Sequence, residues 1–182
     1  LLPKEHKIST YLKAEELRAR LSSAFRVKCD TTDNSAGWKF AEYEMKGVPV
    51  RLEIGPKDIE NNQCVLVRRD TNEKITVSLD NIEEELENLL KAVHDNMYER
   101  ALERLENRIY EAHDYDEFKQ TVEEKPGFIK AMWCGDLECE LKIKEDTTAT
   151  SRCMPFGVDA IGDKCVCCGK PAQKLVVWGK AY

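Results

Sequence analysis

The spacing of apolar residues divides the first part of the chain into one helical and several strand-like segments. In STYLKAEELRARLSSA (residues 9–24), Leu12, Leu17 and Leu21 lie near one helical face, and Ser9 or Thr10 can cap its start. Short apolar runs predict four strands, at residues 25–30, 48–55, 63–70 and 75–79, with a turn at DTNEK between the last two. Because a helix and strands alternate, we expect a mixed α/β sheet.

A long helix is predicted from Asp80 to about Ile109, because apolar residues recur there at spacings of three and four. Asp80 and Glu83 have the spacing of a capping box at its start. A shorter helix at residues 115–124 ends before Pro126 and Gly127, which we take as a domain boundary. Beyond this boundary, FIKAMWC, CELKI and KLVVWGKAY predict short strands around a group of cysteines.

The net charge of −6 is concentrated in one segment of the chain. Residues 1–79 sum to +2, residues 80–124 to −10 and residues 125–182 to +2. We interpret the acidic run as the solvated face of the long helix, so the flanking segments are free to approach phosphate. We expect no membrane association and no secretory signal. The start LLPKEHK lacks a methionine, and we expect a fragment whose first strand lies partly upstream.

Two pairs of cysteines have the spacing of metal-binding hooks. Cys134 and Cys139 form a C-x4-C pair, and Cys165 and Cys168 form a C-x2-C pair followed by Gly169. Zinc is the predicted ion, because it takes four thiolates in a tetrahedron and needs no redox chemistry. A glycine after the second cysteine lets backbone N–H groups turn toward the sulfurs. A site closed by four sulfurs has no open position for substrate, so the zinc is expected to be structural.

The other cysteines leave alternatives open. Disulfides are disfavoured without a secretion signal, and a thiol redox site normally begins a helix in a pattern that is absent here. Cys167 also allows a hook with Cys165, whereas Cys153 is expected to pack near the site without ligating. Cys29 and Cys64 fall inside predicted strands and are expected in the core. Because the metal domain is small, we expect it to unfold when zinc is removed.

The chain shows no pattern typical of catalysis. His6, His94 and His113 lie on different predicted elements, and none has a serine or cysteine partner at a recognisable spacing. No glycine-rich loop that could cradle a phosphate is present. We therefore predict no catalytic residue in this chain.

Several segments together identify a family. GWKFAEYEMKGVPVRLEIGPKD (residues 37–58) occurs with VLVRRDTNEK, DNMYERALER, WCGDLECE, SRCMPF and the terminal WGKAY. This combination closely resembles the C-terminal part of the prolyl-tRNA synthetase family, of the archaeal or eukaryote-like type, over nearly the whole chain. The segments GVDAIGDKC and CVCC depart from the sequence that is most common in the family, with Cys167 in place of another residue. This departure leaves the exact ligands of the second hook open.

The resemblance implies the fold and the domain organisation. We expect an α/β fold with a mixed five-stranded sheet and flanking helices, the anticodon-binding fold of class II synthetases, whose first strand can be truncated here. A small α+β zinc-binding domain follows it. The expected bounds are residues 1–108 for the anticodon-binding domain, 109–126 for a helical linker and 127–182 for the zinc-binding domain.

The resemblance also implies residues that contact RNA. Anticodon bases are unstacked, so an aromatic ring can stack on them and polar groups can bond their edges. Proline anticodons end in two guanines, which donate to a carboxylate from N1–H and N2–H and accept from an arginine at O6 and N7. By the resemblance, five residues look like anticodon contacts: Phe40 as the stacking ring, Glu44 as the guanine acceptor, Arg51 as a base or phosphate donor, and Lys57 and Asp58 as further loop contacts.

The residues alone leave other interpretations open. Trp38 and Phe40 can equally be core residues and Glu44 a solvated acid, although in a helix Glu44 would lie one turn after Phe40 and both could face one ligand. Two alternative functions also remain. One is a stand-alone zinc-stabilised module for RNA binding or assembly without catalytic activity, and the other is a thiol redox protein that uses Cys165 and Cys168.

The function that the resemblance implies is recognition of tRNA(Pro) within a cytoplasmic enzyme that attaches proline to tRNA, using ATP, for translation. ATP would bind only to a catalytic domain that this chain lacks, so the chain alone is expected to be inactive. The expected partners are tRNA(Pro), the catalytic domain of the same chain and a second copy in a homodimer. By the resemblance, the terminal carboxylate of Tyr182 looks toward the catalytic domain.

Overall fold

A computed structural model describes the backbone of residues 4–180 and the side chains of residues 8–180. The chain forms two compact units, Leu1–Glu99 and Arg100–Tyr182, and helix α4 (Ile82–Glu106) runs across the division between them. The interpretations of His6 and Tyr182 concern side chains outside this described part. Within it, no helix is both long and apolar enough to cross a lipid bilayer.

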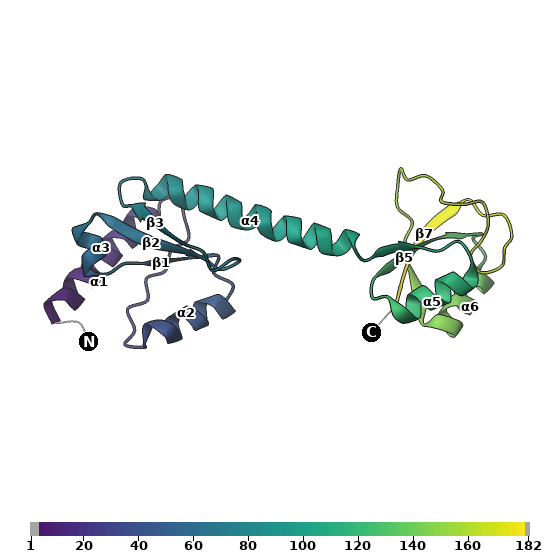
Figure 1. The fold of residues 1–182 in the computed structure, drawn as a ribbon, viewed down its shortest axis with the longest axis horizontal. Helices are drawn as coiled ribbons and strands as arrows, with labels where there is room; N and C mark the ends of the chain where they lie inside the picture. The colour runs from purple at the N-terminus through teal and green to yellow at the C-terminus, as the bar shows by residue number, and fades with distance from the viewer. Residues whose placement is uncertain (1–3, 181–182) are drawn as a thin grey trace. The chain divides into compact units, whose positions relative to one another are not determined.

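The first unit contains a small antiparallel sheet with helices around it (Figure 1). Its strands lie in the order β1-β2-β3, and Leu52 is paired with Leu66, which is paired with Ile75. In chain order the elements before α4 are α1 (Lys4–Leu21), α2 (Ala36–Met45), β1 (Val50–Glu53), α3 (Pro56–Glu60), β2 (Gln63–Arg68) and β3 (Lys74–Ser78).

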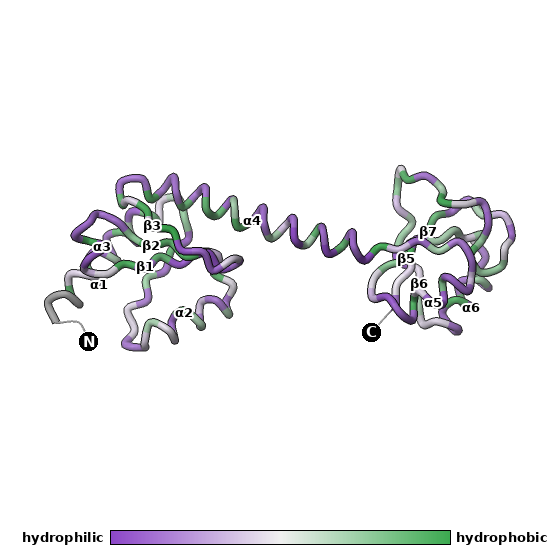
Figure 2. Tube along the Cα trace, viewed as in Figure 1, coloured by the Kyte–Doolittle hydropathy of each residue, from purple (hydrophilic) through white to green (hydrophobic). Residues whose placement is uncertain are grey.

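The core of the first unit forms where apolar faces of α1, the sheet and α4 meet. It consists of Leu17, Leu21, Cys64, Leu66, Val77, Leu79, Ile82 and Leu89. The hydropathy colouring in Figure 2 places hydrophobic residues along the strands and hydrophilic ones on much of α4. The full burial of Cys64 confirms its predicted place in the core.

A tight turn joins β2 to β3 at the predicted DTNEK segment. Asn72 has a φ of 60°, which asparagine tolerates better than most residues. The Arg68 N–H donates to the Glu73 carbonyl and the Asn72 N–H donates to the Arg68 carbonyl. The turn therefore fixes the backbone at the end of β2 and just after it, at Arg68, Arg69 and Asp70.

The first unit corrects several predictions. Its described residues form a three-stranded antiparallel sheet rather than a five-stranded mixed one, although the α/β class is confirmed. Residues 25–30 are not a strand, because Phe25 and Val27 pack against the core while the backbone stays outside the sheet. Cys29 is accordingly only half-buried. Helix α4 begins after Asp80, whose carboxylate accepts from the Asn62 amide instead of capping.

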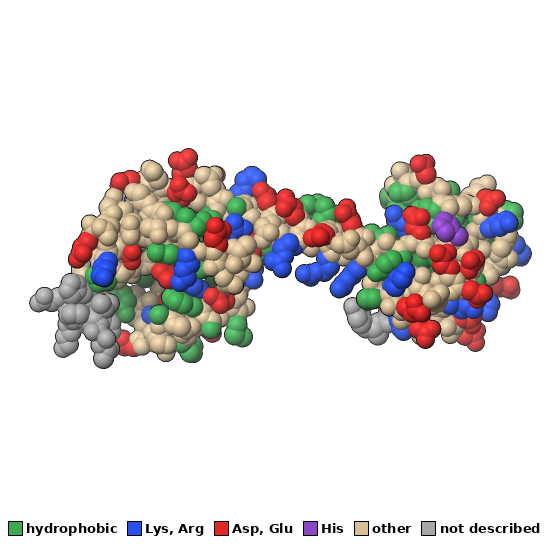
Figure 3. Space-filling model, in the orientation of Figure 1, with side chains coloured by type: hydrophobic (Ala, Val, Ile, Leu, Met, Phe, Trp, Pro, Cys, Tyr) green, Lys and Arg blue, Asp and Glu red, His purple; other side chains and the backbone are tan. Residues whose placement is uncertain are grey.

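Only the first half of α4 packs against the core. Ile82, Leu89 and Val93 are buried, whereas Met97 and Leu105 are 45% and 47% exposed. The predicted apolar stripe is therefore not buried along its whole length. On the face shown in Figure 3, acidic and basic side chains lie together over α4, which agrees with a solvated polar face.

The second unit is a four-stranded mixed sheet with two helices (Figure 1). The strands lie in the order β4-β5-β7-β6, with β4 parallel to β5 and the other neighbours antiparallel. The elements after α4 are β4 (Ile109–Glu111), α5 (Tyr115–Glu124), β5 (Phe128–Trp133), α6 (Leu137–Thr147), β6 (Ala149–Cys153) and β7 (Lys174–Lys180). The predicted helix at residues 115–124 and the strands FIKAMW and KLVVWGK are confirmed.

Trp178 on β7 lies at the centre of the second core. It is fully buried and meets the rings of Phe118 and Trp133 edge to face, with centroids 6.0 and 6.5 Å apart. Ile143 and Val176 complete much of the same cluster, which contains none of the cysteines of the predicted zinc site. The second unit thus has a core to which none of the four cysteines belongs, although Val166, between two of the cysteines, is part of it.

Two predictions about secondary structure in this unit were wrong. CELKI belongs to helix α6, where Cys139 and Ile143 are buried four residues apart while Leu141 is 55% exposed. Asp136 caps this helix by accepting from the Glu138 N–H. Ile109 lies in β4 rather than in the long helix, because α4 ends at Glu106 and the chain then pairs with β5.

Candidate functional site

The two cysteine hooks are held by local backbone structure at one end of the second unit. Cys134 follows β5, and Cys139 lies in the first turn of α6. Cys165 and Cys168 lie in a tight turn closed by the Gly169 N–H, which donates to the Cys165 carbonyl at 2.9 Å. Gly169 has a φ of +69°, a conformation that favours glycine, as the sequence predicted. We call residues 134–139 and 163–170 the cysteine segments.

The structure brings the four predicted ligands together. The Sγ atoms of Cys134, Cys139, Cys165 and Cys168 all lie within 4.8 Å of one another. Cys134 Sγ is 3.7 Å from Cys139 Sγ and 3.9 Å from Cys168 Sγ. Four sulfurs at 2.3 Å from a tetrahedral zinc ion would be about 3.8 Å apart. The donor set and its spacing therefore fit zinc.

The electrostatics of this cluster also fit a cation. Burial acts to raise the pKa of Cys165, but the backbone N–H groups of Cys168, Cys134 and Cys167 outweigh it and lower that pKa to about 7. Burial, together with the sulfurs of Cys168 and Cys134, holds the pKa of Cys139 well above its ordinary value. Thiolates this close repel one another, and a bound dication allows all of them to ionise.

The remaining cysteines of the second unit do not belong to the cluster of four. Cys153 is exposed at the end of β6. Cys167 is half-buried against both apolar clusters of the unit, and burial raises the pKa of its thiol. Cys165 is only 2% exposed, whereas Cys168 of the same hook is exposed.

On the first unit, three predicted RNA-binding residues meet between α2 and β1. The Arg51 guanidinium lies 3.8 Å from the centre of the Phe40 ring and its Nη1 donates to Glu44 Oε1 at 2.6 Å. Its Nε donates to Glu53 Oε1 at 2.9 Å. The Glu44 side chain stays 44% exposed, whereas that of Arg51 is 19% exposed. The α2 helix, which Ser35 caps, places Phe40 and Glu44 one turn apart.

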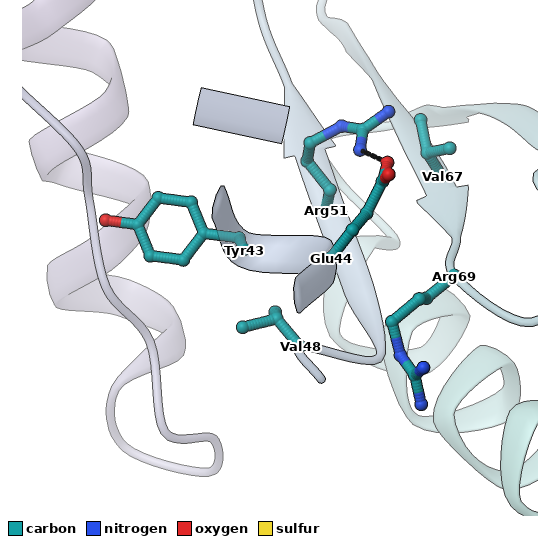
Figure 4. A pocket seen from close by; sticks show the side chains of 6 residues that line it. All are labelled: Tyr43, Glu44, Val48, Arg51, Val67 and Arg69. Atoms are coloured by element: carbon teal, nitrogen blue, oxygen red, sulfur yellow. Dashed lines mark hydrogen bonds and ion pairs between the residues drawn. The ribbon is translucent and has the colours of Figure 1, made fainter. Parts of the chain in front are cut away.

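A small hollow opens beside this group (Figure 4). In the view of Figure 4, Glu44 and Arg51 are joined by their ion pair, while the Arg69 side chain lies below them with its guanidinium directed away from that pair. Its lining residues are Tyr43, Glu44, Val48, Arg51, Val67 and Arg69. The hollow therefore offers acceptor, donor and apolar surfaces within one small area.

The last two predicted contacts lie on α3. Lys57 is exposed. The carboxylate of Asp58 accepts from the Gly55 N–H at 2.8 Å and from the Gln63 amide at 3.4 Å. Asp58 thus closes the turn that begins α3, a local role that the sequence analysis did not identify.

Two further residues at this site were not predicted from the sequence. Tyr43 lines the hollow, and the ammonium groups of Lys28 and Lys46 lie 5.3 and 5.4 Å from its ring centre. Arg69 also lines the hollow, in the RRD sequence directly after β2. An arginine after a strand end was visible in the sequence, but its neighbours in space were not. His94 and His113 are exposed on separate elements and form no site with either group.

Comparison with protein families matches both units. Residues 2–89 match the family described as anticodon binding domain, and residues 115–182 match the family described as prolyl-tRNA synthetase, C-terminal. Phe40, Glu44 and Arg51 lie in the first match, and all four clustered cysteines lie in the second.

Individual relatives give the same result. The chain is 62% identical over 171 residues to a proline–tRNA ligase of Agathobacter rectalis, covering 93% of this chain and 36% of the relative. It is 58% identical over 178 residues to that of Clostridium novyi and 56% identical over 178 residues to that of Ruminiclostridium cellulolyticum. Each of these two alignments covers 98% of this chain and 37% of the relative. The chain thus spans little more than a third of the length of these relatives.

Proposed function

Because this chain belongs to the prolyl-tRNA synthetase family through its anticodon-binding and C-terminal domains, we propose that it recognises the anticodon of tRNA(Pro) for an enzyme that joins proline to tRNA. The proposal assigns recognition to residues 1–108, with residues 109–126 leading to a zinc-binding domain at residues 127–182. Activation of proline with ATP would take place in a catalytic domain outside these residues. We place the enzyme in the cytoplasm, as a homodimer.

The meeting of Phe40, Glu44 and Arg51 is the observation that carries this function. A flipped-out base needs a ring to stack on and polar groups for its edge, and these three side chains supply both in one place. Guanine is the base that donates two N–H groups to a single carboxylate, so the exposed Glu44 suits it. Charge alone would attract any RNA, whereas this combination favours particular bases.

Arg51 has a double role in the proposal. It covers one face of the Phe40 ring, so an incoming base stacks either on the other face or in the place of the guanidinium. It also orients Glu44 and Glu53 through separate nitrogens. A base that takes the Glu44 carboxylate must compete with this ion pair, which favours a base with two well-aligned donors over one with a single donor.

Lys57 and Asp58 complete the proposed contact surface in different ways. The exposed Lys57 is available for a phosphate of the anticodon loop. Because the Asp58 carboxylate is already bonded to Gly55 and Gln63, we propose that it acts mainly by holding Lys57 in place. A direct contact of Asp58 with RNA remains a prediction.

For the second unit we propose a structural zinc ion bound by Cys134, Cys139, Cys165 and Cys168. The spacing of the sulfurs and the donation of backbone N–H groups to Cys165 support this ion. All four positions of the tetrahedron are then filled by protein. The zinc would fix the cysteine segments against the sheet and would take no part in the chemical reaction.

A kinetic comparison in the full-length ligase tests the RNA role. We expect Glu44→Ala to raise the KM for tRNA(Pro) about tenfold or more, because a good bidentate contact to a base contributes roughly 1–3 kcal/mol. Proline activation, measured by ATP–pyrophosphate exchange without tRNA, should not change. Glu85→Ala is the control, since Glu85 is an exposed acid on α4 and is not among the residues that line the hollow. Equal losses in the two assays, or no loss in either, would contradict the assignment.

A further inference from the structure

Arg69 differs from the other arginines of the first sheet in having no polar partner for its inner nitrogen. Its Nε–H is buried and has no acceptor within hydrogen-bond distance among the described residues. One Nη reaches only the sulfur of Met97, at 3.7 Å. Sulfur of a thioether is a weak acceptor, so the donors of this guanidinium are almost unused. The side chain as a whole is half-buried, so its outer nitrogens can donate to a ligand in the hollow that Arg69 lines.

The neighbouring Arg68 shows that this is not a general property of the turn. Arg68 donates to both carboxylate oxygens of Asp70, at 3.0 and 2.7 Å. The Asn96 amide donates to the same carboxylate at 2.6 Å, and the Asp70 side chain is 2% exposed. Asp70, the acidic residue next to Arg69 in the sequence, therefore has its carboxylate bonded to Arg68 and Asn96 and does not pair with Arg69. The two arginines have separate roles, one inside the fold and the other facing the hollow.

We propose that Arg69 binds a backbone phosphate of the anticodon loop, and this inference rests on the proposed function. The hollow lies between Arg69 and the Glu44 carboxylate, with Val48 and Val67 also in its lining. A nucleotide has matching parts, because its phosphate is an anion and a guanine edge donates hydrogen bonds. Arginine presents its donors in a fork that matches phosphate oxygens, and partial burial strengthens such a contact.

Other charges around the hollow agree with a phosphate on the Arg69 side. Glu44 is the acid of the lining, and Arg51 already neutralises it at 2.6 Å. Lys28 and Lys46 lie over the Tyr43 ring at the edge of the same lining. Because the backbone N–H of Arg69 donates to the Pro49 carbonyl at 3.0 Å, the base of the side chain is fixed. In the proposal, the phosphate backbone of an RNA whose base contacts Glu44 would therefore pass the Arg69 side chain.

The salt dependence of RNA binding tests this assignment. The zinc-loaded 182-residue chain is titrated, at several KCl concentrations, with an RNA hairpin that carries a proline anticodon loop, and with hairpins in which each anticodon guanine is replaced. For Arg69→Gln we expect weaker binding to every hairpin and a slope of log affinity against log salt that is smaller by about 0.7 to 0.9. Arg69→Lys keeps the charge and should restore most of the slope. Arg104→Gln removes an exposed arginine of α4 and is the control.

The possible results separate this inference from the function on which it rests. A uniform loss with a smaller slope supports a phosphate contact. Unchanged affinity and slope in Arg69→Gln, with normal binding by the unmodified chain, overturn the inference alone. A loss confined to one guanine position also overturns it, because Arg69 would then read a base. If the unmodified chain does not distinguish the hairpins from one another, the proposed anticodon function itself fails.

Discussion

Replacing Asp70 by asparagine tests how the turn after β2 separates its two arginines. The Asp70 carboxylate accepts from Arg68 and from Asn96, so it ties the β2–β3 turn to helix α4. The hydrogen bonds from Arg68, helped by Asn96, hold the pKa of Asp70 at about 2, below its ordinary 3.8. Asparagine has nearly the same shape but no charge, so the substitution removes the ion pair with little change in packing.

The size of the effect follows from that pKa. A lowering by somewhat under two pH units, at about 1.4 kcal/mol per unit, corresponds to roughly 2 kcal/mol of stability. Leaving the Arg68 guanidinium without its carboxylate adds a cost, since its side chain is only 13% exposed. Glu73 lies 3.6 Å from Arg68 and can take over part of the pairing. We therefore expect Asp70→Asn to lose about 2 to 3 kcal/mol at pH 7.

The pH dependence has a definite sign. The folded pKa of Asp70 is lowered, so its contribution is present above about pH 4 and is lost as the pH falls toward about 2. The unmodified chain should lose this stability over that window, and Asp70→Asn should lose correspondingly less. The two proteins should therefore differ most at neutral pH.

Urea unfolding followed through the amide signals of β2 and β3 measures this effect separately from the second unit. Asp95→Asn is the control, because Asp95 is 46% exposed and pairs with Lys91 within one helix, so its loss should change stability little. Equal stability of Asp70→Asn and the unmodified chain at pH 7, or identical pH dependence, would refute the reasoning.

Three further outcomes concern the second unit. After chelation of zinc, amide hydrogen exchange should increase first in the cysteine segments and only later in strands β5 and β7, because the core around Trp178 contains none of the four cysteines. A simultaneous increase over the whole unit would show that the core depends on the metal. Cys165→Ser should lower the zinc content of the purified chain and Cys153→Ser should not, which elemental analysis can check; equal zinc in both would reject the ligand set. Gly127→Ala should reduce the free energy of unfolding by roughly 1–3 kcal/mol. The reason is that Gly127 has a φ of +153° and an added Cβ would lie 2.1 Å from the Arg108 carbonyl oxygen. An unchanged thermal midpoint of unfolding would contradict this.

The interpretation of the second unit shows the limit of periodicity. In CELKI, alternate positions and positions four apart are both apolar, so a strand and a helix fit equally well. The Asp136 cap and the burial of Cys139 and Ile143 on one face decided for the helix, while Leu141 remained exposed. The expectation that zinc removal unfolds this domain stays a prediction, because the core around Trp178 contains none of the four cysteines but does contain Val166 between two of them.

Local patterns in the sequence were enough to determine the cysteine hooks, three strands of the first unit, the DTNEK turn, the helix at residues 115–124 and the family. Each of these depends on residues close together in the chain or on a recognisable order of motifs. The predicted strand at residues 25–30 was wrong because a strand requires a neighbour in space, which composition does not reveal.

Only the tertiary structure decided which polar groups already have hydrogen-bond or ion-pair partners within the protein. Arg68 and Arg69 are adjacent and chemically identical, yet one is bound to Asp70 and the other has an unused Nε. Asp58 was predicted to contact RNA, but its carboxylate is bonded to Gly55 and Gln63. Partners such as these come from different strands and helices, so their distances are set by packing of the whole unit. The sequence names the groups that can bind, and the fold determines which of them remain available.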